Sequence, residues 1–232
     1  MIFLICDSST LLGSVALFED SKLLSYRESM RRGSHSDMMN VFVHEALDES
    51  QKKLADVDLF VSGVGPGSFT GIRVSLNMIK TFAFCHNKQV LGINSLETLA
   101  FQTEREDLPI VSMINAFKNM VYIGTYLKKG HTLDILSPPQ VVRVQNLKDY
   151  IQSSCLVVGD GYGAYSQYFS PETKAFIQRP NEPLDEPRTR AIAPLVIERV
   201  GQQSHWSTLL PLYLRASEAE ENLQGIKFQP LV

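Results

Sequence analysis

The sequence predicts an α/β protein made of two duplicated lobes. Short apolar segments of strand length alternate with longer helical segments along the chain, an order typical of α/β folds. Segment 2–26 is expected to form strand, polar turn, strand, turn and strand, and segment 110–136 repeats this order with little sequence identity. We therefore expect a first lobe over residues 1–104, a second lobe over 105–215 and a tail over 216–232.

Composition and charge narrow the class of protein. With 232 residues, 44% of them hydrophobic and 20% charged, the chain is ordinary for a soluble globular protein. The formal net charge of −3 gives no electrostatic footprint for nucleic acid. Cys6, Cys85 and Cys155 lie far apart in apolar surroundings, so we expect buried, reduced thiols. No apolar run resembles a signal peptide or a membrane span, and we expect a soluble, cytoplasmic protein.

The first lobe is expected to open with three strands and a helix. Residues 2–5 are continuously apolar, as in a central strand covered on both faces. A polar turn follows at 6–10, and two further strands are expected at 14–18 and 23–27. The mostly apolar segment 37–50, which begins with an acidic residue, is expected to be helical.

The stretch from residue 59 to residue 85 organises the first lobe. An apolar strand at 59–64 leads into the turn Gly65–Ser68 and then into a helix at 69–85. Ser68 or Thr70 can cap this helix. Such a turn can cradle a phosphate, or it can simply pack a helix tightly on a sheet. A P-loop is excluded because the Gly-Lys-Ser/Thr ending is absent.

Both long helices carry more apolar surface than one sheet face requires. The apolar residues of the helix at 69–85 form two stripes at helical spacing, namely Ile72, Leu76, Ile79 and Ala83, and Val74, Met78, Phe82 and Cys85. Either the two helices cover two faces of a large sheet, or they form a pair that docks onto a partner. In the second case, the expected partner-interface residues are Met38, Met39, Phe42, Val43, Phe69, Val74, Met78 and Phe82.

The remaining elements complete the two lobes. Further strands are expected at 90–93, 110–114, 120–127, 132–136, 156–158 and 211–215. Further helices are expected at 95–102, 144–151, 164–168 and 190–203. Residues 170–188 are rich in proline and polar residues, and we expect a loop there.

Several of these segments together resemble a known family. In chain order they are DSST with GSVAL at 7–17, His35-Ser36, GVGPGSFTGIRV at 63–74, GDG at 159–161 and PLYLR at 211–215. This set resembles the TsaB (YeaZ) family over residues 1 to about 215, and the GPGSFTG run with its helix is the most specific part.

The resemblance implies a fold, a function and partners. The fold is that of the actin-like ATPase (ASKHA) superfamily, with two duplicated ribonuclease-H-like lobes. The function is that of a non-catalytic partner subunit in the synthesis of N6-threonylcarbamoyladenosine at position 37 of bacterial tRNA. The implied partners are TsaD, bound through the helices at 37–50 and 69–85, TsaE, and a second copy of the chain when TsaD is absent. Contact with tRNA occurs only through the complex. No cofactor of its own is implied, and ADP or ATP is placed at the interface with a partner.

The sequence also departs from the family pattern at two turns. Asn115-Ala116-Phe117 stands where many members carry Asp-Ala-Arg, and Gly63-Val64-Gly65 stands where Gly-Arg-Gly is usual. Any family function that depends on those charges is therefore not expected here.

The alternative function is a stand-alone actin-like ATPase, with Asp7 as the candidate cofactor-binding residue. Asp7 follows the first strand, where such enzymes place a metal-coordinating carboxylate. The turn after it has no glycine until Gly13, which disfavours close approach of amides to a phosphate. We favour Asp7 as a turn residue bonded to its own backbone. The five histidines have no metal-binding spacing, so no metal site and no catalytic residue is expected.

Overall fold

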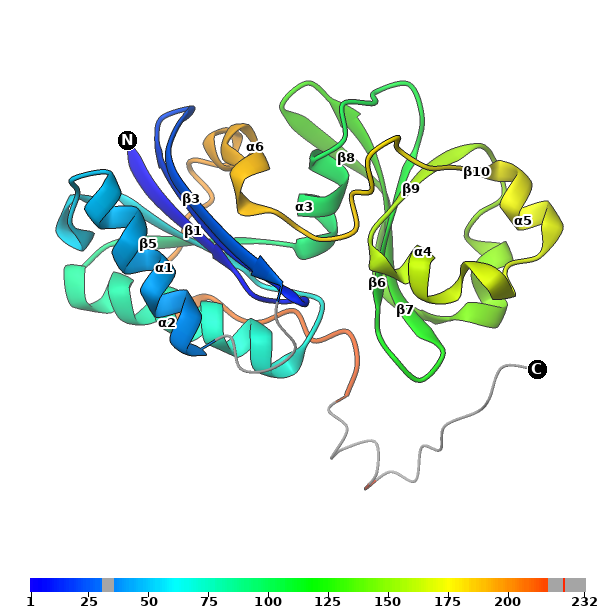
Figure 1. The fold of residues 1–232 in the computed structure, drawn as a ribbon, viewed down its shortest axis with the longest axis horizontal. Helices are drawn as coiled ribbons and strands as arrows, with labels where there is room; N and C mark the ends of the chain where they lie inside the picture. Colours follow the sequence, from blue (N-terminus) through cyan, green and yellow to red (C-terminus); the bar gives the residue numbers. More distant parts are fainter. Residues whose placement is uncertain (31–35, 217–222, 224–232) are drawn as a thin grey trace.

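Two five-stranded sheets with the same strand order form two adjacent lobes in the computed structural model, which describes residues 1–30, 36–216 and 223 (Figure 1). The first sheet has the order β3-β2-β1-β4-β5. Its strands are β1 (Ile2–Asp7), β2 (Leu12–Glu19), β3 (Lys22–Met30), β4 (Leu59–Gly63) and β5 (Gln89–Ile93). β1 pairs antiparallel with β2 and parallel with β4.

The second sheet repeats this topology. Its order is β10-β9-β6-β7-β8, and β6 pairs antiparallel with β7 and parallel with β9. The strands are β6 (Ile110–Asn115), β7 (Met120–Lys129), β8 (Thr132–Arg143), β9 (Cys155–Val158) and β10 (Ile177–Gln178). The two sheets therefore share one strand order and one pairing pattern, as the duplicated α/β lobes predicted from the sequence require.

The first sheet is buried on both faces, as its apolar first strand predicts. Leu4 and Cys6 of β1 face the core beneath α1 (Ser36–Glu49) and α2 (Phe69–His86), which lie side by side on that face (Figure 1). Phe3 and Ile5 point to the opposite face, into a core completed by α6 (Ala193–Glu198). A strand covered on both faces needs apolar residues at every position.

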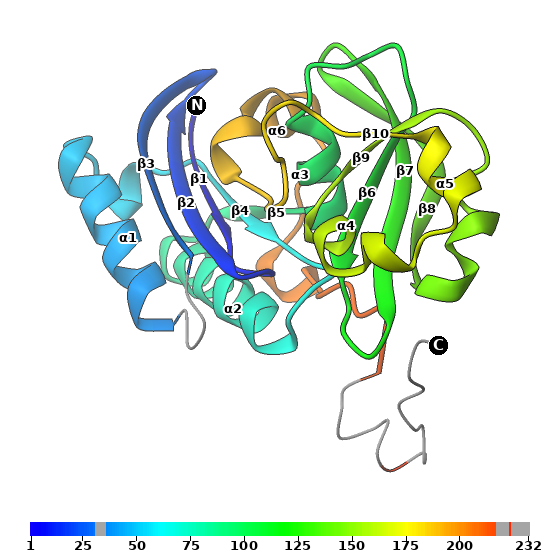
Figure 2. The same ribbon diagram turned by 45° about the vertical axis from the view of Figure 1, so that its right-hand side comes forward.

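One short helix connects the lobes. α3 (Ser95–Phe101) lies between the two sheets (Figure 2). Its Leu96 and Leu99 pack into the core of the second lobe, while Phe101 packs into that of the first. The chain returns to the first lobe near its end, because α6 packs there and the backbone N–H of Leu212 donates to the carbonyl of Val64 at 2.8 Å.

The helices of the second lobe are short and partly differ from the prediction. They are α4 (Asp160–Tyr165) and α5 (Pro171–Phe176), and the expected helix at 144–151 is a 3₁₀ helix over Val144–Asp149. α5 and β10 fall in the segment expected to be loop. The Ser170 side chain accepts from the N–H of Thr173, and Pro171 starts α5, a combination that favours helix initiation.

Two further expectations near the chain end are wrong. The helix expected over 190–203 is confined to α6, which follows a 3₁₀ turn at Thr189–Ala191. Pro194 explains the late start, because proline is tolerated in the first turn of a helix but not in its interior. Residues 211–215 form no strand.

The expectation of three buried thiols holds for two of them: Cys6 and Cys155 are buried, whereas Cys85 is exposed.

Two sequence-based expectations fall on residues beyond the described ranges, namely His35 and nearly all of the tail 216–232. Within the described ranges, no helix combines the length and apolar character needed to cross a membrane.

Candidate functional site

The turn before α2 packs directly on the loop after β1. Ser68 caps the helix, since its side chain accepts from the N–H of Gly71 at 3.2 Å. The N–H of Ser68 donates to the carbonyl of Ser9 at 2.7 Å, and Ser8 Oγ donates to the carbonyl of Gly71 at 2.8 Å. A Cβ at Gly67 would lie 2.0 Å from the Ser9 oxygen, so only glycine allows this approach. The geometry thus matches the packing interpretation of the turn.

Asp7 is enclosed by the same loop. Its side chain is 2% exposed, and its carboxylate accepts from the N–H of Ser9 at 2.7 Å and from Ser95 Oγ at 3.1 Å. A Cβ at Gly63 would lie 2.2 Å from this carboxylate. Asp7 therefore holds the loop and the start of α3 together. As the sequence favoured, it bonds its own turn.

The second lobe has a corresponding, partly buried carboxylate that the sequence did not single out as functional. The N–H of Asn115 donates to Asp160 at 2.8 Å across the ends of β6 and β9. Burial raises the pKa of Asp160 to about 6, against the opposing hydrogen bond from the Asn115 backbone. The sequence signal for Asp160 was its place in a Gly-Asp-Gly turn that directly follows the predicted strand at 156–158.

A second buried acid joins the lobes. Glu186 is 5% exposed, hydrogen-bonds Thr10 and the backbone of Leu12, and has one oxygen without a partner. Burial raises its pKa to about 7, and the charge of Asp160 acts in the same direction. Because Glu186 and Thr10 lie far apart in the chain, no local sequence pattern predicts this contact.

The two stripes of α2 have different environments. Ile72, Leu76, Ile79 and Ala83 are buried in the first lobe. The side chains of Val74, Met78 and Phe82 are only partly buried. The structure thus separates one core face from one outward face on the same helix, as the spacing predicts.

The predicted partner-interface set needs one correction. Met39 and Val43 are 0% and 3% exposed and belong to the core of the first lobe, because α1 presses them against the sheet. A side chain without exposed surface cannot contact a partner in this state. The other members are partly exposed and come from α1 and α2, namely Met38, Phe42, Phe69, Val74, Met78 and Phe82.

A surface groove runs along the outward face of α2, and we call it the α2 groove. Its volume is about 470 Å³. The residues that line it are Asn40, Thr70, Arg73, Val74, Asn77, Met78, Thr81 and Phe82. Apolar side chains along the groove with a polar border are typical of protein contact surfaces.

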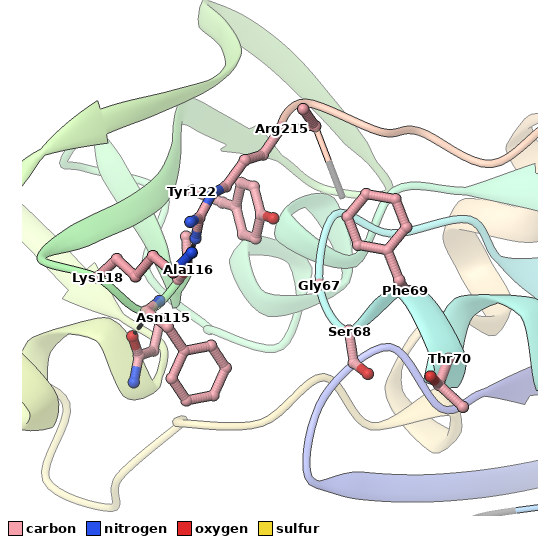
Figure 3. Close-up of a pocket in the computed structure, with 11 residues that line it drawn as sticks. Gly67, Ser68, Phe69, Thr70, Asn115, Ala116, Lys118, Tyr122 and Arg215 are labelled. Atoms are coloured by element: carbon pink, nitrogen blue, oxygen red, sulfur yellow. Dashed lines mark hydrogen bonds between the residues drawn. The ribbon is translucent and has the colours of Figure 1, made fainter. Parts of the chain in front are cut away.

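A second hollow lies between the lobes, and we call it the interlobe pocket (Figure 3). Its volume is about 530 Å³. Ser68, Phe69 and Thr70 form its first-lobe side, and Asn115, Ala116 and Lys118 face them from the second lobe (Figure 3).

In the described part of the chain, no group of three or more His, Cys, Asp or Glu side chains could hold a metal ion.

Comparison with known proteins identifies the family. The model of the TsaD family, tRNA N6-adenosine threonylcarbamoyltransferase, matches residues 29–175. The tRNA threonylcarbamoyladenosine biosynthesis protein TsaB of Bacillus subtilis is 29% identical over 224 residues, covering 94% of this chain and 96% of that protein. The protein of the same name from Escherichia coli is 25% identical, covering 97% and 99%. The chain belongs to this family, in its TsaB (YeaZ) branch.

A solved TsaB-branch structure has the same architecture. YeaZ from Pseudomonas aeruginosa superimposes with a TM-score of 0.77 at 25% sequence identity, covering 92% of this chain and 99% of that one. The tRNA N6-adenosine threonylcarbamoyltransferase of Agrobacterium fabrum is 36% identical, but over only 44% of this chain and 30% of that protein. The TsaB-branch similarity therefore covers nearly the whole chain, whereas the similarity to this transferase covers less than half of it.

Proposed function

We propose that this chain is a non-catalytic partner subunit in bacterial synthesis of N6-threonylcarbamoyladenosine at position 37 of tRNA, and that it dimerises with the catalytic subunit TsaD. The observation that carries the proposal is the outward face of α2. Val74, Met78 and Phe82 recur every four residues along it and line one groove. A partner helix laid along this groove would bury them.

The environment of Asp7 supports a role without catalysis. Its carboxylate is already bonded to Ser9 and Ser95, and Gly63 lies against it with no room for a side chain. A metal-bound nucleotide would need that carboxylate to be open. The alternative of a stand-alone ATPase therefore gains no support from this site.

The remaining partner and cofactor assignments follow from the same proposal. TsaE joins the complex, two copies of the chain pair through the α2 groove when TsaD is absent, and tRNA is contacted only within the complex. ADP or ATP binds at the junction with a partner rather than in a site of this chain alone. The complex works in the cytoplasm.

Size-exclusion chromatography of the purified chain mixed with purified TsaD tests the proposal. The wild-type chain is expected to co-elute with TsaD, and Met78→Glu is expected to abolish co-elution, because a charge is placed in the apolar groove. Leu136→Glu is the matched control, since Leu136 is 54% exposed on β8 of the other lobe. An unchanged melting temperature of each variant shows that it is folded. Co-elution of Met78→Glu at the wild-type level would refute the assignment of this face.

A further inference from the structure

The α2 groove carries a positive charge without an acid beside it. Of the described residues that line the groove, Arg73 is the only charged one, and the other polar ones are Asn40, Thr70, Asn77 and Thr81. α2 contains no Asp or Glu along its 18 residues. Arg73 takes part in none of the ion pairs that the described residues form. The charge of this guanidinium is therefore not balanced within the groove.

The acids of the neighbouring helix are engaged elsewhere. α1 lies beside α2 (Figure 1) and carries four acids. Glu45 and Glu49 pair with Arg27 of β3 at 3.0 Å and 2.9 Å, and Asp48 contacts a histidine one turn earlier at 3.0 Å. Asp37 does not line the groove and has an interaction of its own. The groove thus presents a cation and no carboxylate to anything that docks there.

Two aromatic rings hold the Arg73 side chain in one orientation. Its Nε donates to the Tyr213 hydroxyl at 2.8 Å, and its Cζ lies 5.9 Å and 5.7 Å from the ring centroids of Phe69 and Tyr213. The two rings stack on each other with centroids 4.5 Å apart. Arg73 makes no other hydrogen bond with the described residues, so both terminal nitrogens can donate to a partner. A guanidinium that is already oriented loses little freedom when it binds a carboxylate.

The charge of Arg73 is not needed by α2 itself. Ser68 caps the helix, and Arg73 follows five residues later, in the N-terminal part of α2. The helix dipole favours acids at that end and cations at the other. The Arg73 side chain is exposed, so it adds nothing to the core of the first lobe. Its charge is therefore best explained by a group outside the chain.

We propose that TsaD places a carboxylate against Arg73, and that this contact favours TsaD over a second copy of the chain. The inference rests on the proposed function, because it specifies the contact made at the same groove. A two-fold contact between two copies presents one surface twice. In such a pair, each groove adds a cation and no carboxylate, and burying a charge without a partner is costly. A different protein can supply the acid, so Arg73 attracts one partner and disfavours the other.

Isothermal titration of the full chain with purified TsaD, at low and at high salt, tests the attractive contact. Arg73→Gln is expected to weaken binding about tenfold or more and to reduce its salt dependence. Arg73→Lys keeps the charge and is expected to retain the salt dependence with a smaller loss. Arg105→Gln is the matched control, since it removes the same charge before β6, where Arg105 pairs with Asp107 at 2.6 Å. This control should bind like the wild type, and similar melting temperatures show that all variants are folded.

Analytical ultracentrifugation of the chain alone tests the repulsive contact. Arg73→Gln is expected to self-associate about threefold or more tightly than the wild type, because two like charges are removed from the contact. Added salt should strengthen self-association of the wild type by screening these charges. Unchanged self-association in Arg73→Gln would overturn the role of Arg73 in choosing the partner.

Two outcomes separate this inference from the proposed function. Wild-type TsaD affinity in Arg73→Gln, together with loss of binding in Met78→Glu, would overturn the carboxylate contact and leave the groove as the TsaD surface. Wild-type affinity in both variants would overturn the proposed function as well. Tyr213→Phe keeps the ring stack but removes the hydroxyl that orients the guanidinium, so it should weaken binding less than Arg73→Gln does. A larger loss in Tyr213→Phe would assign the contact to the tyrosine and overturn the role of Arg73.

Discussion

The two lobes share a sheet topology but differ in their helices. In the first lobe, α1 and α2 span 14 and 18 residues, whereas α4 and α5 of the second lobe span 6 residues each. A short helix has just enough surface to cover its sheet. α2 is long enough to bury one stripe in the core and to present another outward. The duplication thus provides a common scaffold, and the length of α2 allows one helix to contribute both to the core and to an outward groove.

The largest expected effect separates the two faces of α2. Ile79→Ala is expected to lower the free energy of unfolding by about 2–5 kcal/mol, because Ile79 is fully buried. Val74→Ala, on the outward face, is expected to cost less than about 1 kcal/mol. Urea denaturation of both variants measures the difference. Equal losses would mean that α2 has no surplus face, and the contrast between the lobes would fail.

Asp7 and its loop give the next effect. Asp7→Ala is expected to lower the free energy of unfolding by about 1–3 kcal/mol, because the buried Ser9 amide and Ser95 hydroxyl lose their acceptor. ATP turnover by the purified chain is expected to stay at its background level in both proteins. Turnover that is present in the wild type and absent in Asp7→Ala would instead favour an ATPase in the first lobe.

The acids between the lobes predict a dependence on pH. Burial raises the pKa of Glu186 to about 7 in the folded chain, from about 4.5 when unfolded. The folded state therefore holds this proton more tightly, so the contribution of Glu186 to stability is fully present below about pH 4.5 and is lost as the pH rises toward 7. A tenfold difference in proton affinity between the folded and unfolded states corresponds to about 1.4 kcal/mol of stability.

Glu186→Gln is expected to reduce the loss of stability between pH 4.5 and 7. Asp160→Asn is expected to reduce it over the lower part of that range, because the pKa of Asp160 rises only to about 6. Thermal unfolding from pH 4.5 to 8 measures both effects. A fall of the same size in Glu186→Gln would show that this carboxyl is not the group that titrates.

Matched helix caps give the smallest effect. Ser68 caps α2 and Ser170 caps α5, each accepting from the N–H three residues on at 3.2 Å. Replacing either serine by Ala is expected to lower the free energy of unfolding by about 1 kcal/mol. A much larger loss for Ser68→Ala, seen in urea denaturation, would indicate that the turn before α2 carries strain that the cap restrains.

Local periodicity predicted much of the fold and part of the candidate site. The two stripes of α2 follow from a spacing of three and four residues, and the structure places Ile79 inside and Met78 outside accordingly. The same approach placed Met39 and Val43 at a partner surface, because α1 has apolar residues on several sides. Periodicity identifies a stripe, but only the packed structure decides which stripe faces the sheet.

Contacts between distant segments could not be predicted. Glu186 meets Thr10 across the lobes, and Arg215 reaches the carbonyl of Ala116. Neither pair follows a local rule of spacing. Two missed features did have local signals, namely the Ser170-Pro171 start of α5 and the proline at 194 that limits α6.

The central claim is that the outward face of α2 binds TsaD. Isothermal titration of purified TsaD with Val74→Ala, Met78→Ala and Phe82→Ala tests it most directly, with Leu136→Ala as the control on the other lobe. We expect at least one of the three variants to weaken binding by about tenfold or more, as residues at the centre of an interface do. The control should bind like the wild type. Wild-type affinity in all three variants would contradict the account.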